Sequence, residues 1–179
     1  MGKGTKSAAE INTFQDPITG ASITQLTDYF AHSFHLYFTN NGWYDNGSKL
    51  LLCSDRDNTS NLYSLDIASG ELTQLTDLNR NVPKGIHGTY INPHKNEAYF
   101  TLEKSIIAID LQTYKEKVIY TRPDGYNFSN LSCTADGSYL CFGLSEDLSS
   151  SINTNLSGGY VALRKRKQLA LTAKFVYFY

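Results

Sequence analysis

Two histidines at related positions are the first candidates for chemistry in this sequence. His35 and His87 each follow a loop-like segment and stand at the start of a stretch of strand-forming residues. An imidazole can donate and accept hydrogen bonds, so such a pair would suit the hydroxyl and carboxylate groups of a ligand. The alternative is that each ring is satisfied by neighbouring backbone. His32 and His94 are expected in a loop and a turn.

Arg56 is the third candidate for ligand binding. It lies in the polar loop Asp55–Ser60, where a guanidinium could bind a carboxylate through two parallel hydrogen bonds. Asp55 and Asp57 flank it, and an internal ion pair that organises the loop is the alternative that this proximity favours. The sequence identifies no catalytic residue. Further cations fall in loops of the same kind: Arg80, Lys84 and Arg122.

Several other kinds of site are not predicted. Asp55 and Asp57 lack the additional oxygen ligands of a calcium loop, and the sequence has no phosphate-binding glycine loop, nucleophile elbow or aromatic–basic pattern typical of nucleic-acid binding. A net charge of -1 gives no reason to expect nucleic acid or an anionic membrane as partner. Cys53, Cys133 and Cys141 show no CxxC spacing, so we expect free, mostly buried thiols in a reducing compartment and hence a cytoplasmic location.

A repeated hexapeptide indicates the fold that must position these candidates. ITQLTD at 23–28 returns as LTQLTD at 72–77, 49 residues later, and KVIYTR at 117–122 is a fainter third copy. The composition, with 13 Tyr and 9 Phe but 1 Met, is typical of an all-β protein. A period of about 40–50 residues built from short strands predicts a β-propeller with one four-stranded blade per repeat.

The repeat divides the chain into a 1–22 N-terminal segment, a partial propeller over 23–160 and a basic and apolar tail over 161–179. Within the propeller, the predicted parts are an orphan outer strand at 23–28 and blades at about 35–77, 88–121 and 128–160. In the first blade the expected strands are an inner strand near 36–39, then 49–54, 61–67 and 71–76. Asp66 and Asp110 each precede a turn and are expected to cap it.

The fold so predicted is incomplete, with about two and a half blades where closed rings have about four to eight. The orphan strand has no inner strands ahead of it, so we expect unpaired strand edges and possible self-association through them. No blade strand is recognisable in the tail. A divergent insertion or an altered C-terminus of a longer chain are the two interpretations, and the second is favoured.

Specific segments of the sequence resemble the oligogalacturonate lyases, the seven-bladed enzymes of pectin breakdown grouped as family 22 polysaccharide lyases. The segments are MGKG at the start, TFQDPITGASITQLT at 13–27, HLYFTNNGW at 35–43, SDRDNTSNLYSLDIASGELTQLTD at 54–77 and IDLQTYKEKVIYT at 109–121. The resemblance covers about residues 1–160 and leaves out the tail. The SDRD segment is also similar to TolB-like propellers.

This resemblance implies β-elimination of short galacturonate oligomers to unsaturated uronates. In such enzymes a divalent cation, expected to be manganese, neutralises the carboxylate beside C5 and a base removes the C5 proton. The family's histidine-rich metal site lies in later blades, and no histidine of this sequence lies beyond His94. We therefore expect no metal ligands here and no activity from this chain alone, with an oligogalacturonide as the bound partner. The alternative is a TolB-like binding or scaffold module without catalysis.

Overall fold

The computed structural model of this chain describes residues 2–78, 86–146, 159–165 and 168–175, and side chains as far as residue 146. The chain divides into two compact units, Met1–His87 and Gly88–Tyr179. Apart from two short 3-10 turns, η1 (Asp45–Gly47) and η2 (Arg56–Asn58), the named elements are strands. None of the helical segments in the described residues is long and apolar enough to cross a membrane. The predicted loop cations Arg80 and Lys84 lie outside the described residues.

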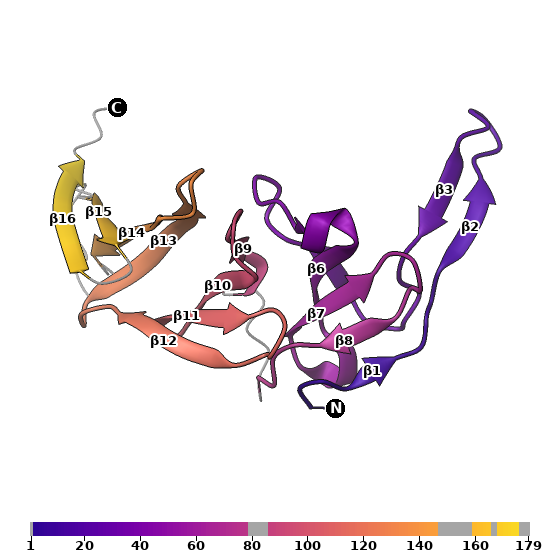
Figure 1. Ribbon diagram of the computed structural model, residues 1–179, viewed down its shortest axis with the longest axis horizontal. Coiled ribbons are helices and arrows are strands. Elements are labelled where there is room, and N and C mark those ends of the chain that lie inside the picture. The colour runs from indigo at the N-terminus through magenta and orange to yellow at the C-terminus, as the bar shows by residue number, and fades with distance from the viewer. Residues whose placement is uncertain (1, 79–85, 147–158, 166–167, 176–179) are drawn as a thin grey trace, which may run out of the picture. The chain divides into compact units, whose positions relative to one another are not determined.

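Three antiparallel strands form the centre of the first unit (Figure 1). They are β6 (Lys49–Ser54), β7 (Asn61–Asp66) and β8 (Leu72–Gln74), and they lie within the predicted ranges. Their apolar side chains are buried together, with Leu26 and Ile67 packed against them; the buried set is Leu50, Leu52, Tyr63, Leu65 and Leu72.

The first strand of this blade differs from the expectation. The sequence predicted an inner strand near Leu36–Thr39, but the chain pairs with β6 through two short pieces, β4 (Ser33–His35) and β5 (Trp43–Tyr44). Between them the Tyr37 N–H donates to the His87 carbonyl at 2.9 Å. The intervening stretch therefore forms a hydrogen bond outside the sheet, which is why the predicted strand does not form there.

The N-terminal segment adds a strand that the sequence analysis did not predict. β1 (Lys6–Ser7) pairs antiparallel with the outer strand β8. The Gly4 N–H donates to the Gln74 carbonyl at 2.8 Å and the Gln74 N–H to the Thr5 carbonyl at 2.9 Å. β8 is a strand of three residues. The bonds from the N-terminal segment cover its outer edge, which would otherwise be open to pairing with another chain.

The orphan strand also has a partner, which corrects the expectation that nothing upstream would pair with it. β3 (Ser22–Gln25) forms a hairpin with β2 (Asn12–Gln15), with Phe14 opposite Ile23 (Figure 1). Its turn repeats the one between β7 and β8, so the hairpin corresponds to the third and outer strands of a blade.

An aspartate caps each of these turns. Asp16, Asp66 and Asp110 accept hydrogen bonds from backbone N–H groups two or three residues later at 2.7–2.9 Å. These bonds stabilise the ionised carboxylates and lower their pKa values. The predicted capping role of Asp66 and Asp110 is thereby confirmed, and Asp16 shares it.

The second unit contains two four-stranded antiparallel sheets. One has the order β12–β11–β10–β9 and the other β13–β14–β15–β16 (Figure 1). The bounds of the first sheet are β9 (Tyr90–Ile91), β10 (Glu97–Leu102), β11 (Ser105–Asp110) and β12 (Glu116–Thr121). Those of the second are β13 (Tyr126–Cys133), β14 (Tyr139–Glu146), β15 (Gly159–Lys165) and β16 (Gln168–Phe175).

The tail therefore differs from the expectation that it holds no blade strand. β15 pairs with β14 and β16 pairs with β15, so the tail supplies two strands of the last sheet. The sequence of β15 contains Tyr160 and Val161, and that of β16 contains Thr172 and Phe175. Aromatic and β-branched residues favour strands even where no familiar turn motif separates them.

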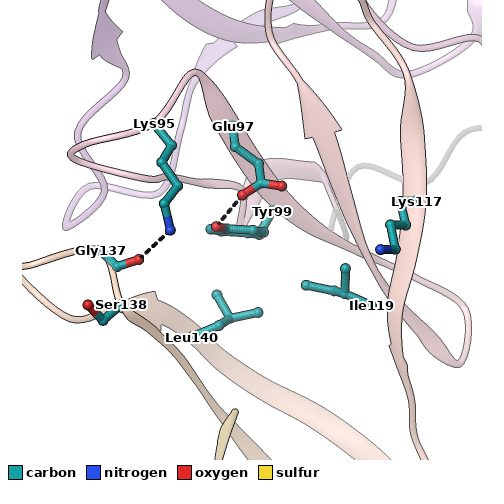
Figure 2. A pocket seen from close by; sticks show the side chains of 8 residues that line it. All are labelled: Lys95, Glu97, Tyr99, Lys117, Ile119, Gly137, Ser138 and Leu140. Atoms are coloured by element: carbon teal, nitrogen blue, oxygen red, sulfur yellow. Dashed lines mark hydrogen bonds between the residues drawn. The ribbon is translucent and has the colours of Figure 1, made fainter. Parts of the chain in front are cut away.

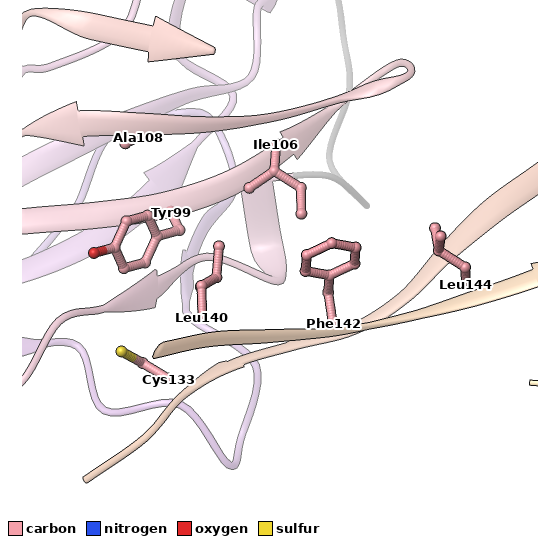
Figure 3. Close-up of a cluster of buried hydrophobic side chains, with 7 residues drawn as sticks. All are labelled: Tyr99, Ile106, Ala108, Cys133, Leu140, Phe142 and Leu144. Carbon is pink, nitrogen blue, oxygen red and sulfur yellow. The ribbon is translucent and has the colours of Figure 1, made fainter. Parts of the chain in front are cut away.

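Buried side chains from both sheets form the core of the second unit. Tyr99, Ile106 and Ala108 come from β10 and β11, while Cys133 and three residues of β14 come from the other sheet (Figure 3). Phe142, 2 % exposed, lies in the middle of this cluster and contacts the rings of Tyr120 and Phe128. The two sheets are thus held face to face by apolar burial.

Candidate functional site

Five ring side chains of the first unit form a connected surface, which we call the aromatic–histidine cluster. His87 makes edge-to-face contacts with Phe34 and Tyr37, each with ring centroids 6.2 Å apart. His32 packs edge-on against Phe34 at 5.5 Å, and Phe38 packs against Tyr37 at 4.4 Å. The cluster thus joins the end of β4, the segment after it and His87.

Hydrogen bonds to the backbone position this cluster. The register of β4 against β6 places Phe34 opposite Cys53. The buried Cys53 thiol donates to the Ile86 carbonyl at 3.3 Å, and the Tyr37 N–H donates to the His87 carbonyl. Burial, and secondarily the charge of Asp55, raises the pKa of the Cys53 thiol to about 12. The thiol therefore stays protonated and able to donate at neutral pH.

The cluster leaves large apolar surfaces in contact with solvent. Phe34 is 37 % exposed, Tyr37 45 % and Phe38 83 %. Contiguous exposed apolar surface marks interaction sites on soluble proteins. Flat aromatic faces beside an imidazole can pack against the C–H face of a ring-shaped ligand while the nitrogen atoms bond its polar groups.

His35 has surroundings different from those of His87. Its Nδ1 lies 3.0 Å from the Leu36 carbonyl oxygen, and its Nε2 faces the backbone of Gly42. A Cβ at Gly42 would lie 2.8 Å from that nitrogen and 2.9 Å from the Leu51 carbonyl oxygen, so only glycine fits there. The two histidines that the sequence suggested as a ligand-binding pair therefore have different contacts. The His35 ring lies against neighbouring backbone, as in the alternative given for it, whereas the His87 ring packs against Phe34 and Tyr37.

The other histidines occupy the kinds of position expected for them. His32 is exposed in the segment before β4, and its carbonyl oxygen accepts from the Asp55 N–H. His94 lies in the turn before β10, with Nε2 2.8 Å from the Ala135 carbonyl oxygen.

Arg56 pairs with a carboxylate distant in the sequence, and not with the aspartates that flank it. Its guanidinium binds both carboxylate oxygens of Glu10, 46 residues away, with Nη1–Oε1 at 2.5 Å and Nη2–Oε2 at 2.8 Å. The side chain is 1 % exposed and also lies over the Tyr29 ring, 4.6 Å from its centroid. The predicted pairing with Asp55 or Asp57 is replaced by a bond to the N-terminal segment, while Asp55 accepts from Ser60.

The Arg56–Glu10 pair shifts the titration of both groups. The hydrogen bonds from Arg56 lower the pKa of Glu10, and the same bonds raise the pKa of Arg56. The Glu10 carboxylate also accepts from the Asp28 N–H at 2.9 Å. One carboxylate therefore ties the N-terminal segment, the loop after β3 and the loop after β6 together.

The described residues do not offer a metal site. Among them, no group of three or more His, Cys, Asp or Glu side chains lies close enough to hold a metal ion. The histidines instead contact rings and backbone carbonyl groups. This set of donors in the described residues does not fit a bound manganese ion.

Comparison with known proteins gives a consistent result. The sequence model described as Oligogalacturonate lyase matches residues 1–143. An oligogalacturonide lyase of Pectobacterium atrosepticum is 32 % identical over 142 residues, and an oligogalacturonate lyase of Dickeya dadantii is 31 % identical over 140 residues. Each match covers 75 % of this chain but 35 % of the relative. The chain thus spans about a third of the length of these curated relatives.

Solved structures agree on the fold. An oligogalacturonate lyase in complex with manganese superposes with a TM-score of 0.81 at 22 % identity, covering 97 % of this chain and 48 % of that one. TolB from Acinetobacter baumannii gives a TM-score of 0.56 at 16 % identity, over 87 % of this chain and 37 % of that one. The predicted incomplete β-propeller is confirmed.

The Glu10–Arg56 pair should be a major stabilising contact of the first unit. Replacement of Glu10 by Gln leaves a buried guanidinium without its counter-charge, so we expect Glu10→Gln to lower the free energy of unfolding by about 3 kcal/mol. Urea denaturation followed by fluorescence of Trp43, the only tryptophan, measures this. The matched control is Glu71→Gln, which removes an exposed pair with Lys6 and should cost less than about 1 kcal/mol.

Acid should act through the same carboxylate. The pKa of Glu10 in the folded chain is below the ordinary 4.5 of a glutamate, so the stability that its ionised carboxylate contributes is present above that pH and is lost as pH falls through the lowered pKa. The wild type should therefore lose more stability than Glu10→Gln between neutral pH and about pH 3. Equal losses in the two proteins would contradict the assigned pair.

Alkali should weaken the first unit through Cys53. Its pKa rises from 9.0 unfolded to about 12 folded, so stability decreases as pH rises through this window. Between about pH 9 and 10 the wild type should lose about 1 kcal/mol that Cys53→Ala does not lose. Denaturation of each protein at both pH values measures the difference. Cys133 and Cys141 are present in both proteins, so a loss of equal size would assign the effect to another group.

Proposed function

Since the chain belongs to the oligogalacturonate lyase family, we propose that it binds oligogalacturonides and is part of a protein that cleaves them by β-elimination. The observation that carries this proposal is the aromatic–histidine cluster. It presents ring faces and an imidazole to solvent on backbone fixed by the sheet.

The chemistry of the ligand suits this surface. A galacturonate ring has an apolar C–H face, a rim of hydroxyl groups and a carboxylate. We assign the C–H face to Phe34 and Tyr37, and the polar groups to His87, the predicted ligand-binding residue that lies in the cluster.

The other two predicted ligand-binding residues have supporting roles in this proposal. Arg56 fixes the N-terminal segment and the loop after β6 through Glu10, so its guanidinium is already neutralised. His35 packs on Gly42 and holds the chain where it leaves β4 toward Tyr37.

A cytoplasmic location is part of the proposal. Cys53, Cys133 and Cys141 are free thiols, and two of them are buried. Such thiols are stable in a reducing compartment. Short galacturonate oligomers would then have to be taken up before they are bound.

The binding proposal predicts a specific role for Tyr37. We expect the 179-residue chain to bind trigalacturonate in isothermal titration calorimetry, and Tyr37→Ala to bind it about tenfold more weakly because a stacking face is lost. The matched control is Phe14→Ala, because Phe14 is 46 % exposed, close to the 45 % of Tyr37, but lies on the β2–β3 hairpin. Equal affinity of Tyr37→Ala and wild type would contradict the assigned surface.

The chain alone should bind without turnover. Its four histidines contact rings or backbone groups and no described residues gather as metal ligands. With trigalacturonate and manganese chloride we therefore expect no rise in the ultraviolet absorbance of an unsaturated uronate. A metal-dependent rise would show that this chain holds a complete active site. Absence of trigalacturonate binding would instead favour the TolB-like binding module.

A further inference from the structure

A cavity of about 150 Å³ lies in the second unit, and none of the residues that line it belongs to the aromatic–histidine cluster (Figure 2). It is lined by β10 and the turn before it, by β12, and by β14 and the turn before it. The lining residues are Lys95, Glu97, Tyr99, Lys117, Ile119, Gly137, Ser138 and Leu140. A space of this size limits an occupant to a small molecule.

The wall of this cavity is fixed by hydrogen bonds. Buried Asn92 donates from Nδ2 to the Tyr99 hydroxyl at 3.0 Å and to the Gly137 carbonyl at 3.1 Å. Gly137 has φ +65°, and a Cβ there would lie 2.5 Å from the Asn92 Oδ1, so the turn requires glycine. The turns before β10 and β14 are thus locked together. A site built this way loses little freedom when a ligand enters.

Charged and hydroxyl groups line opposite parts of the cavity. The Lys95 ammonium donates to the Gly137 carbonyl at 3.3 Å. Lys117 reaches in from β12 on the far side (Figure 2). Glu97 accepts from the Tyr99 hydroxyl at 2.7 Å and contributes a carboxylate to the cavity wall. Ser138 adds a hydroxyl, which also hydrogen-bonds the Asp136 carboxylate and keeps lone pairs that can accept.

The floor between these groups is apolar. Ile119 and Leu140 face each other across it, beside the ring of Tyr99 (Figure 2). Two cations, an acceptor, a hydroxyl and an apolar floor are complementary to a small ring that carries a carboxylate, hydroxyl groups and a C–H face.

We propose that this cavity binds a single hydroxylated carboxylate, such as one uronic acid, at a site separate from the oligogalacturonide surface. The carboxylate lies between Lys117 and Lys95, the hydroxyl groups face Glu97 and Ser138, and the C–H face packs on Leu140 and Ile119. The class of ligand follows from the cavity. The choice of a uronic acid as the natural member of that class rests on the proposed function.

Titration of the full chain, labelled with ¹⁵N, with galacturonate tests the site by NMR. We expect amide shifts at Ser138 and Leu140. Lys117→Met keeps the stem of the side chain without its charge and should bind at least about tenfold more weakly. Lys115→Met is the matched control, because Lys115 lies on the same segment but does not line the cavity. Galactose, without the carboxylate, and acetate, without the ring, should each bind more weakly than galacturonate.

Equal galacturonate affinity for Lys117→Met and wild type would overturn the inference, as would amide shifts confined to the aromatic–histidine cluster.

The experiments distinguish failure of the cavity site from failure of the oligogalacturonide surface. Loss of galacturonate binding in Lys117→Met, with no effect of Tyr37→Ala on trigalacturonate, leaves the carboxylate site standing and removes the assigned oligomer surface. The reverse pattern removes the cavity site and keeps that surface.

Discussion

The aspartate-capped turn between the third and outer strands is the interaction on which the repeat depends. The carboxylates of Asp16, Asp66 and Asp110 each accept hydrogen bonds from backbone N–H groups two or three residues later in the chain. The backbone N–H of the residue four positions later donates to the carbonyl oxygen of the same aspartate. This fourth residue has a positive φ in all three turns: Gly20, Gly70 and Tyr114. The turn therefore reverses the chain at a fixed register, and the outer strand must follow. The repeated sequence and the repeated hairpin have one physical cause.

That cause also explains how much of the fold the sequence could predict. Strands β6, β7, β10 and β11 are short segments rich in apolar and aromatic residues and are bounded by polar turns, so local chemistry determines them. The pairing of β1 with β8 and the bond from Arg56 to Glu10 join residues more than 40 positions apart. A local sequence pattern does not identify partners that lie so far apart in the chain. For Arg56, the flanking aspartates suggested an ion pair within the loop, whereas the observed partner is Glu10.

The candidate site was predictable only in part, for a related reason. His87 was found because its place in the repeat matched that of His35. Phe34 and Tyr37 were not singled out as candidates because they stand beside or within a stretch that was interpreted as a continuous strand. The Tyr37–His87 backbone bond draws that stretch out of the sheet. The close fit of Gly42 against β6 marks where the chain returns. A glycine after two asparagines is the one local sign of this interruption.

The interaction partner of a basic residue is a better indication of whether it can bind an anion than its position in a loop that is expected to face a ligand. The Arg56 guanidinium is buried and paired with a carboxylate through two hydrogen bonds, so a ligand carboxylate would have to compete with Glu10 at a high desolvation cost. The Lys95 ammonium instead bonds a backbone carbonyl beside a cavity. The cation expected from its loop position thus has a protein carboxylate as partner, and the proposed anion site uses a lysine from a turn between two strands.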